Sequence, residues 1–258
     1  MRVTWEEAGW EELGPRVGRC RLPVWDCTAG LVVGEGAALM IDAGSGLREG
    51  ARLRTEARRL LGGGRVTHLA LTHPHFDHAF GAAAFAGVEI FGAVGLERVL
   101  VDERDALRAD AVRNGADPGE AAEAADLLVR PRHLVSGEWT LDLGGGVQVL
   151  LANVGPGHTA HDLAILVRGG LGDPGGPSSP SGPGTGSPEI VFCGDLVEES
   201  GEPQAGPDAV PSRWPAALDR LLALGGEDAV YVPGHGAAVD AGFVRAQRDA
   251  LARRFGVP

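Results

Sequence analysis

Three histidines and one aspartate lie within six consecutive positions of the segment THPHFDH, directly after an apolar run. They are His73, His75, Asp77 and His78. Because side chains two apart in an extended segment point the same way, His73 and His75 can hold one ion. Asp77 and His78 follow where the chain turns into a helix, so they can face a second ion. Without a ligand these donors would crowd one another, so the chain must adopt a fold that displays them at the end of a buried strand.

Three further donors stand beside glycine after apolar runs: His158 in GPGHT, Asp195 in CGD and His235 in PGHG. Imidazole and carboxylate donors together suit zinc or iron. The three cysteines fit no C-x-x-C pattern, so no soft thiolate set is evident. The sequence therefore predicts a metal centre assembled from separate strand ends.

The apolar pattern predicts an α/β (α+β) fold with two strand-rich halves, each flanked by helices. Strands are expected within residues 16–25, 29–34, 37–44, 66–73, 88–92, 138–143, 147–154, 162–167, 189–195 and 228–234. Helices are expected at 47–61, 77–85, 215–224 and 240–255, with one or two more in 97–128, broken near 114–119. Such halves favour two mixed β-sheets packed face to face with helices outside, an αββα sandwich.

Residues 1–258 are interpreted as a single domain, and the Gly/Pro/Ser-rich segment 169–188 as a flexible surface loop within it. The charged helical segment 97–128 is interpreted as a solvated surface, with a lid over the site as the alternative.

Composition narrows the expected partners to small molecules. The net charge of −12 and the pI near 5.1 disfavour nucleic acid, which requires a basic face. No apolar stretch approaches the length of a membrane span, and residues 1–20 do not resemble a signal peptide. The odd number of cysteines favours a reduced, cytoplasmic setting. The oligomeric state stays open.

The ordered pattern His-x-His-x-Asp-His, Gly-His, Gly-Asp and Gly-His resembles the metallo-β-lactamase superfamily in its glyoxalase II-like form. The resemblance covers nearly the whole chain and implies the αββα fold. It also implies two metal ions per chain, with zinc expected and iron or manganese as alternatives. By resemblance, His73, His75 and His158 hold the first metal, Asp77, His78 and His235 the second, and Asp195 bridges them. Asp42 matches an aspartate that supports the ligand histidines from behind.

This resemblance implies a metal-dependent hydrolase. A bridging hydroxide would attack an ester, thioester, lactone or amide bond, and Asp77 would orient it as the catalytic residue. β-Lactam hydrolysis is one alternative, although all 23 basic residues are arginine and no lysine is present for a substrate carboxylate. A persulfide dioxygenase with a single iron is another, and a non-catalytic binding module a third.

Several polar and aromatic residues lie outside the pattern. His68, His133 and His161 are interpreted as surface or structural histidines. Cys193 lies two positions before Asp195 and is a possible alternative ligand, although a small buried hydrophobe is the favoured interpretation. Trp214 and Tyr231 are expected in the core rather than in the pocket.

Overall fold

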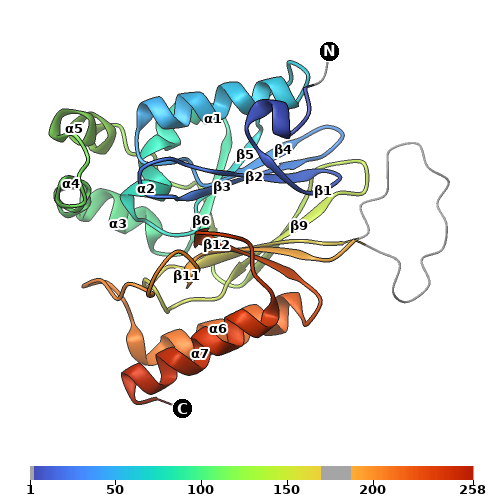
Figure 1. Cartoon of the computed structure of the whole chain (residues 1–258). Coiled ribbons are helices and arrows are strands. Elements are labelled where there is room, and N and C mark those ends of the chain that lie inside the picture. Colours follow the sequence, from blue (N-terminus) through green and yellow to red (C-terminus); the bar gives the residue numbers. More distant parts are fainter. Residues whose placement is uncertain (1–2, 170–186, 258) are drawn as a thin grey trace.

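The computed structural model describes residues 3–169 and 187–257 (Figure 1). Two β-sheets face each other in this part of the chain, and helices cover their outer faces. The αββα architecture expected from the sequence is confirmed. None of the helices among these residues is long and apolar enough to cross a membrane. That the whole chain is one domain stays a prediction.

The larger sheet has seven strands in sequence order in the described residues. They are β1 (Glu11–Gly14), β2 (Val17–Arg21), β3 (Thr28–Val33), β4 (Ala38–Ile41), β5 (His68–Ala70), β6 (Glu89–Ala93) and β7 (His133–Val135). Neighbours from β1 to β4 are antiparallel, whereas those from β4 to β7 are parallel. The parallel half therefore aligns the carboxyl ends of its strands at one edge.

The second sheet has five strands in the order β12-β11-β10-β9-β8 in the described residues. They are β8 (Glu138–Asp142), β9 (Gln148–Asn153), β10 (Leu163–Val167), β11 (Ile190–Glu198) and β12 (Val230–His235). Only β11 and β12 pair in parallel among these five, so both run toward the same edge. These two strands carry two of the predicted donors, Asp195 in β11 and His235 at the end of β12.

The helices that cover the first sheet come from the segment before β1 and from the long connections between its strands. They are η1 (Glu6–Ala8), α1 (Leu47–Leu60), α2 (Phe76–Ala79), η2 (Phe80–Phe85), α3 (Leu96–Asp102), α4 (Arg104–Arg113) and α5 (Pro118–Asp126). The second sheet is covered by α6 (Trp214–Gly225) and α7 (Ala241–Phe255), preceded by the turn η3 (Pro211–Arg213) (Figure 1).

Apolar side chains fill three layers, because both faces of each sheet are covered. In β3, Val32 packs between the sheets while Ala29 and Leu31 pack under the helices. In β10, Ile165 faces the inner layer and Leu166 faces α6 and α7. Continuous apolar runs therefore form strands buried on both faces, as the sequence pattern indicates.

Three expectations differ from the structure or are not tested by it. Residues 97–128 form three helices, because Asp117 caps α5 through bonds from the Gly119 and Glu120 amides and a further break falls at Glu103. The strand expected to end at Asp195 continues to Glu198. The Gly/Pro/Ser segment expected to be flexible lies, in its central part 170–186, outside the described residues.

A glycine contact fixes α1 against the segment that carries the histidine cluster. A Cβ atom on Gly50 of α1 would clash with the Gly81 carbonyl oxygen of η2, and one on Gly81 would clash with the Ala43 carbonyl oxygen. The Gly81 amide donates to the Gly44 carbonyl over 2.9 Å. Since η2 continues directly from α2, this close approach positions Asp77 and His78 from behind.

We expect Gly50→Ala to lower the free energy of unfolding by about 1–3 kcal/mol, because the added methyl must push two backbone segments apart. Urea denaturation measures the change. Gly36→Ala is the matched control, since no atom lies within 4 Å of a Cβ built there. Equal stability of the two variants would contradict the proposed role of this contact.

Candidate metal centre

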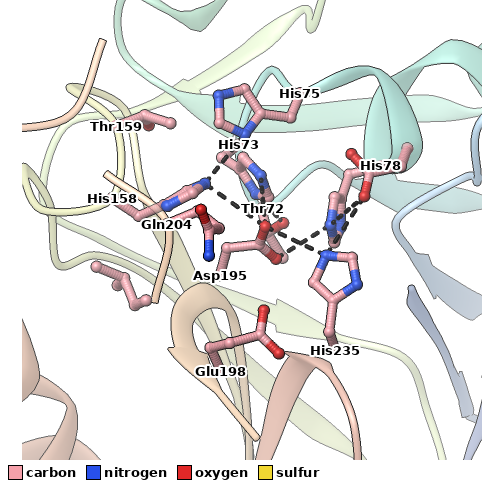
Figure 2. A network of polar contacts seen from close by, with 12 residues as sticks. Thr72, His73, His75, His78, His158, Thr159, Asp195, Glu198, Gln204 and His235 are labelled. Atoms are coloured by element: carbon pink, nitrogen blue, oxygen red, sulfur yellow. Dashed lines mark hydrogen bonds and ion pairs between the residues drawn. The ribbon is translucent and has the colours of Figure 1, made fainter. Parts of the chain in front are cut away.

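The predicted donors converge at one place between the two sheets (Figure 2). His73 and His75 lie in the loop after β5, and Asp77 and His78 lie in α2. His158 comes from the connection between β9 and β10, Asp195 from β11 and His235 from the end of β12. Segments distant in sequence therefore meet at the strand ends, where rigid scaffolds display functional groups.

The first group comprises His73, His75, His158 and Asp195, whose ligand atoms lie within 4.8 Å of one another. His158 Nε2 is 3.0 Å from His75 Nδ1. Asp195 Oδ2 lies 3.6 Å from His73 Nε2 and 3.5 Å from His158 Nε2. Three imidazole nitrogens and a carboxylate oxygen thus surround one point, a donor set that suits zinc.

The second group comprises His78, Asp195 and His235, again within 4.8 Å. Asp77 Oδ2 adjoins it, 3.3 Å from His235 Nε2 and 3.7 Å from His78 Nε2. Asp195 contacts this group as well, with Oδ1 3.1 Å from His78 Nε2 and Oδ2 3.3 Å from His235 Nε2. Asp195 is therefore common to both groups.

One nitrogen atom at the centre shows that these side chains suit a ligand. His73 Nε2 is buried and makes no hydrogen bond within the described residues. An unsatisfied buried polar atom costs about 1–3 kcal/mol, so such atoms are rare unless they bind something. His73 Nε2 also faces the carboxylate shared by both groups, so it is placed to bind an ion there.

The histidines of the centre differ in their proton content. Burial and the charge of His78 hold the pKa of His73 well below its ordinary value, and burial lowers the pKa of His158 to about 4. These imidazoles are neutral near pH 7, the form that binds metal. Burial opposes protonation of His235, but Asp195 and Asp77 raise its pKa to about 12. Burial likewise opposes protonation of His75 in the first group, but the bond to Asp208 raises its pKa. A metal ion at either group must therefore displace protons as it binds.

Contacts on the far side of the His73 and His78 rings determine which ring nitrogen of each faces the centre. Asp42 Oδ2 lies 2.8 Å from His78 Nδ1 and accepts from the Thr72 hydroxyl, while Asp42 Oδ1 accepts from the Thr72 amide. The Thr72 hydroxyl lies 2.9 Å from His73 Nδ1. The Nε2 atoms of His78 and His73 are thereby left for the centre, which agrees with the supporting place inferred for Asp42.

Two further contacts of this kind come from loops. His75 Nε2 lies 2.9 Å from Asp208 Oδ2, which leaves Nδ1 for the first group. His235 Nδ1 lies 2.7 Å from the Trp25 carbonyl oxygen, to which it donates, and the Trp25 indole donates in turn to the Asn114 carbonyl at the end of α4. Sequence reasoning missed these residues, because no local pattern marks Asp208 or Trp25 as partners of distant histidines.

The backbone of β11 bends to bring Asp195 into position. Gly194 has φ +53°, and its pairing with β12 is irregular on both sides. A Cβ atom there would lie 2.9 Å from the Thr72 side chain, so only glycine fits without strain. This bulge aims the carboxylate at the centre although the strand continues beyond it.

The connection that carries His158 is tied down by Asp162. The Asp162 carboxylate accepts from the Thr159 amide and hydroxyl over 2.9 and 2.7 Å, and it is buried. Trp214 packs edge-on against the His158 ring at 5.3 Å, and its indole donates to the Leu196 carbonyl. The His158 ring is therefore held by packing rather than by a hydrogen bond to its Nδ1.

Comparison with known proteins agrees with this geometry. The family model described as the Metallo-beta-lactamase superfamily matches residues 22–235. The chain belongs to the metallo-β-lactamase superfamily. A search of curated protein sequences gave no match.

Solved structures similar to this superfamily member support the same fold. A metallo-beta-lactamase from Pontibacter korlensis is 20% identical, with 94% of this chain and 97% of that chain covered at a TM-score of 0.66. A metallo-beta-lactamase from Hirschia baltica is 15% identical, with 96% of this chain and 97% of that chain covered at a TM-score of 0.64. FIM-1 from Pseudomonas aeruginosa, in its mono-zinc form, is 19% identical, with 96% of each chain covered at 0.64. At these identities the likeness shows the fold alone.

In this metallo-β-lactamase superfamily member a cavity of about 500 Å³ opens from the donors. Helices α3 and α4 supply one wall of lining residues, including Leu107, and the segment after β11 supplies others, including Gln204. The interpretation of residues 97–128 as a plain solvated surface is therefore incomplete. Part of that segment lines the site.

The cysteines divide between the core and the centre. Cys193 is buried in the apolar layer with α6 and α7, which confirms its interpretation as a small hydrophobe. Cys27, which sequence reasoning missed, lies beside Asp77 and His78. Its sulfur is 3.6 Å from both ring nitrogens of His78, so it contacts the ring as a whole rather than one nitrogen atom. Burial raises the pKa of the Cys27 thiol to about 12. No sequence motif marks this position.

The other residues singled out in the sequence lie outside the donor groups. His133 Nε2 lies 2.7 Å from a Glu89 oxygen, His161 Nδ1 lies 2.9 Å from the Val94 carbonyl oxygen, and His68 contacts the Thr67 hydroxyl. These are the structural contacts expected for histidines outside the pattern. Trp214 and Tyr231 are fully buried in the core, as expected.

Removing the carboxylate behind His75 is expected to weaken metal binding. We expect Asp208→Ala to lower the zinc affinity of the first group by about 10–100-fold, because the His75 ring loses the contact that orients it. Competition with a chromophoric chelator measures the affinity. The control is Asp219→Ala, which removes a surface carboxylate that pairs with Arg248. An Asp208→Ala affinity within twofold of the parent protein would contradict the orienting role.

Proposed function

We propose that this protein is a metal-dependent hydrolase with two zinc ions per chain, acting on ester, thioester, lactone or amide bonds. The observation that carries the proposal is that one carboxylate, Asp195, lies between two groups of donors, each built from neighbouring side chains. A carboxylate has two oxygens and can bind one ion with each. Membership of the superfamily supports the same conclusion.

The residues divide into two sets by the groups described above. His73, His75 and His158 would hold the first ion, Asp77, His78 and His235 the second, and Asp195 both. When bound, zinc supplies hydroxide near neutral pH and polarises the carbonyl oxygen of a substrate. Iron or manganese would suit the same nitrogen and oxygen donors.

The chain's own residues prepare the site for this chemistry. Asp77 is buried, and although burial opposes ionisation, the charge of His78 and a bond from His235 lower the pKa of Asp77. Its carboxylate is therefore ionised and able to accept a proton beside the centre. We assign to Asp77 the orientation of the attacking group and the transfer of a proton toward the leaving group.

The cavity supports a small molecule as the substrate. About 500 Å³ lies within the range of ligand pockets, which begins near 300 Å³. With a net charge of −12, the chain does not favour nucleic acid. We further propose a cytoplasmic location, on the ground of the three free cysteines, all of which are buried.

Metal analysis combined with activity screening tests the proposal. The parent protein, purified without chelators, should contain two zinc ions and hydrolyse a member of a panel of thioesters, lactones, β-lactams and phosphodiesters. One iron per chain with oxygen consumption would indicate persulfide oxidation instead. Only trace transition metal would contradict the metal centre.

The double variant His73→Ala/His75→Ala should lose the first metal ion and retain at most residual hydrolysis, since two of the four donors of that group are removed. Elemental analysis and the substrate found in the panel measure both effects. The matched control is His68→Ala/His133→Ala, which removes two histidines outside the centre. Metal loss equal in both double variants would contradict the assignment.

Asp195→Asn keeps the shape of the side chain but removes the charge that both groups share. We expect weaker binding of the second metal and turnover reduced by roughly 10²-fold, about 2.7 kcal/mol in barrier height. The thermal midpoint should stay close to that of the parent, because the lost interaction belongs to the centre and not to the apolar layers. Retention of both metals and full turnover would contradict the bridging role.

A further inference from the structure

The walls of the cavity above the donors are predominantly negatively charged. Apart from the donors, its lining contains five carboxylates and one guanidinium group: Glu103, Asp110, Glu198, Glu202, Asp208 and Arg113. Glu103, Asp110 and Arg113 come from α4 and the residue before it, and the remaining three follow Asp195 in β11 and its loop. The acidic groups therefore belong to two separate chain segments that both line this cavity.

Two of the five carboxylates already form ion pairs with other side chains. Arg113 Nη2 lies 2.9 Å from Asp110 Oδ1, so the one basic group of the lining is engaged. Asp208 is bound to His75. In the described residues, the Glu103 and Glu202 side chains form neither hydrogen bonds nor ion pairs, and both residues are exposed. Apart from the histidine donors, this lining offers an anionic substrate no free basic group.

Glu198 is the acidic side chain of the walls that Figure 2 shows beside the donors, with its carboxylate directed toward Asp195 and His235. Its Oε1 accepts from the Ser200 amide over 3.0 Å and from the Ser200 hydroxyl over 2.7 Å. Oε2 makes no hydrogen bond within the described chain. Glu198 is half-buried, so a cation bound to its free oxygen would be partly shielded from water.

The floor of the cavity gives independent evidence of a ligand site. His73, which is 1% exposed, carries an unpartnered Nε2 atom that faces Asp195, one of the residues lining the cavity. Two bound zinc ions would bring four positive charges to this floor, and Asp77 and Asp195 would offset two of them. The five carboxylates of the walls, even with Arg113 counted against them, would outnumber the two positive charges that remain.

We propose that the cavity selects substrates that carry a positively charged group, such as a primary or quaternary ammonium, held by Glu198 near the centre and attracted by Glu103 and Glu202 at the mouth. This inference rests on the proposed hydrolase function, because it concerns the group attached to the bond that is cleaved. Complementary charge in a confined cleft raises both the rate of encounter and the discrimination against like charge.

Three acetate esters of similar size test the preference on the zinc-loaded full-length protein. Their alcohol portions end in a trimethylammonium group, a tert-butyl group or a carboxylate. We expect kcat/KM to fall in that order, with at least a tenfold difference between the ammonium and tert-butyl esters. Glu198→Gln should reduce that ratio at least fivefold, whereas Glu123→Gln, an exposed carboxylate on α5 outside the cavity, should leave the ratio unchanged.

Binding provides a measure that does not depend on turnover. Uncleavable ethers with the trimethylammonium or the carboxylate end are titrated into the zinc-loaded full-length protein by calorimetry. We expect the ammonium ether to bind at least tenfold more tightly, and Glu198→Gln to remove most of that difference.

The outcomes separate the two hypotheses. If no ester is cleaved but the ammonium ether binds selectively, the hydrolase proposal fails for these bonds and the charge preference stands. If the esters are cleaved with equal efficiency, or the carboxylate compounds are preferred, the charge preference is wrong and the hydrolase proposal stands. If no ester is cleaved and neither ether binds, the charge preference is also wrong.

Discussion

Asp195 lies within ion-pair distance of nitrogen atoms on four histidines, at 3.6 Å from His73, 3.1 Å from His78, 3.5 Å from His158 and 3.3 Å from His235. The charges of His78 and His235 outweigh the effect of burial and hold the pKa of Asp195 well below its ordinary value. The carboxylate is thus ionised at any physiological pH. Histidines from both sheets are arranged around this one negative charge, which a buried position tolerates only when cations surround it.

The sequence predicted the layers and the donors for a common reason. Apolar runs such as 163–167 have few alternatives to a strand buried on both faces, and polar residues directly after them must then lie at a sheet edge. The short strand β1, with no buried residue, carries no such pattern and was not predicted. Neither was β7, which has three residues and one buried side chain.

What the sequence did not reveal depends on contacts between distant segments. Asp208 follows His75 by 133 residues and reaches it through a loop with little apolar content. The bulge at Gly194 lets β11 pass the centre, whereas the local pattern of glycine and aspartate indicated a strand end. The helices of 97–128 are amphipathic only weakly, so their pattern does not say which face lines a cavity. In each case the position follows from packing that forms only when the two sheets meet.

Trp25 contacts both the metal-centre histidine His235 and the end of helix α4, which lines the cavity. Its carbonyl oxygen receives the bond from His235, its indole binds the end of α4, and its ring packs edge-on against Phe76 at 5.2 Å. The cavity wall and the histidine of the second group therefore share one support. Divergence of this protein toward new substrates is constrained here, because remodelling α4 to admit a larger molecule also disturbs the orientation of His235. In the segment after β11, Asp208 imposes a similar constraint through His75, so variants with altered selectivity would arise more readily at its other positions, such as Glu202 and Gln204.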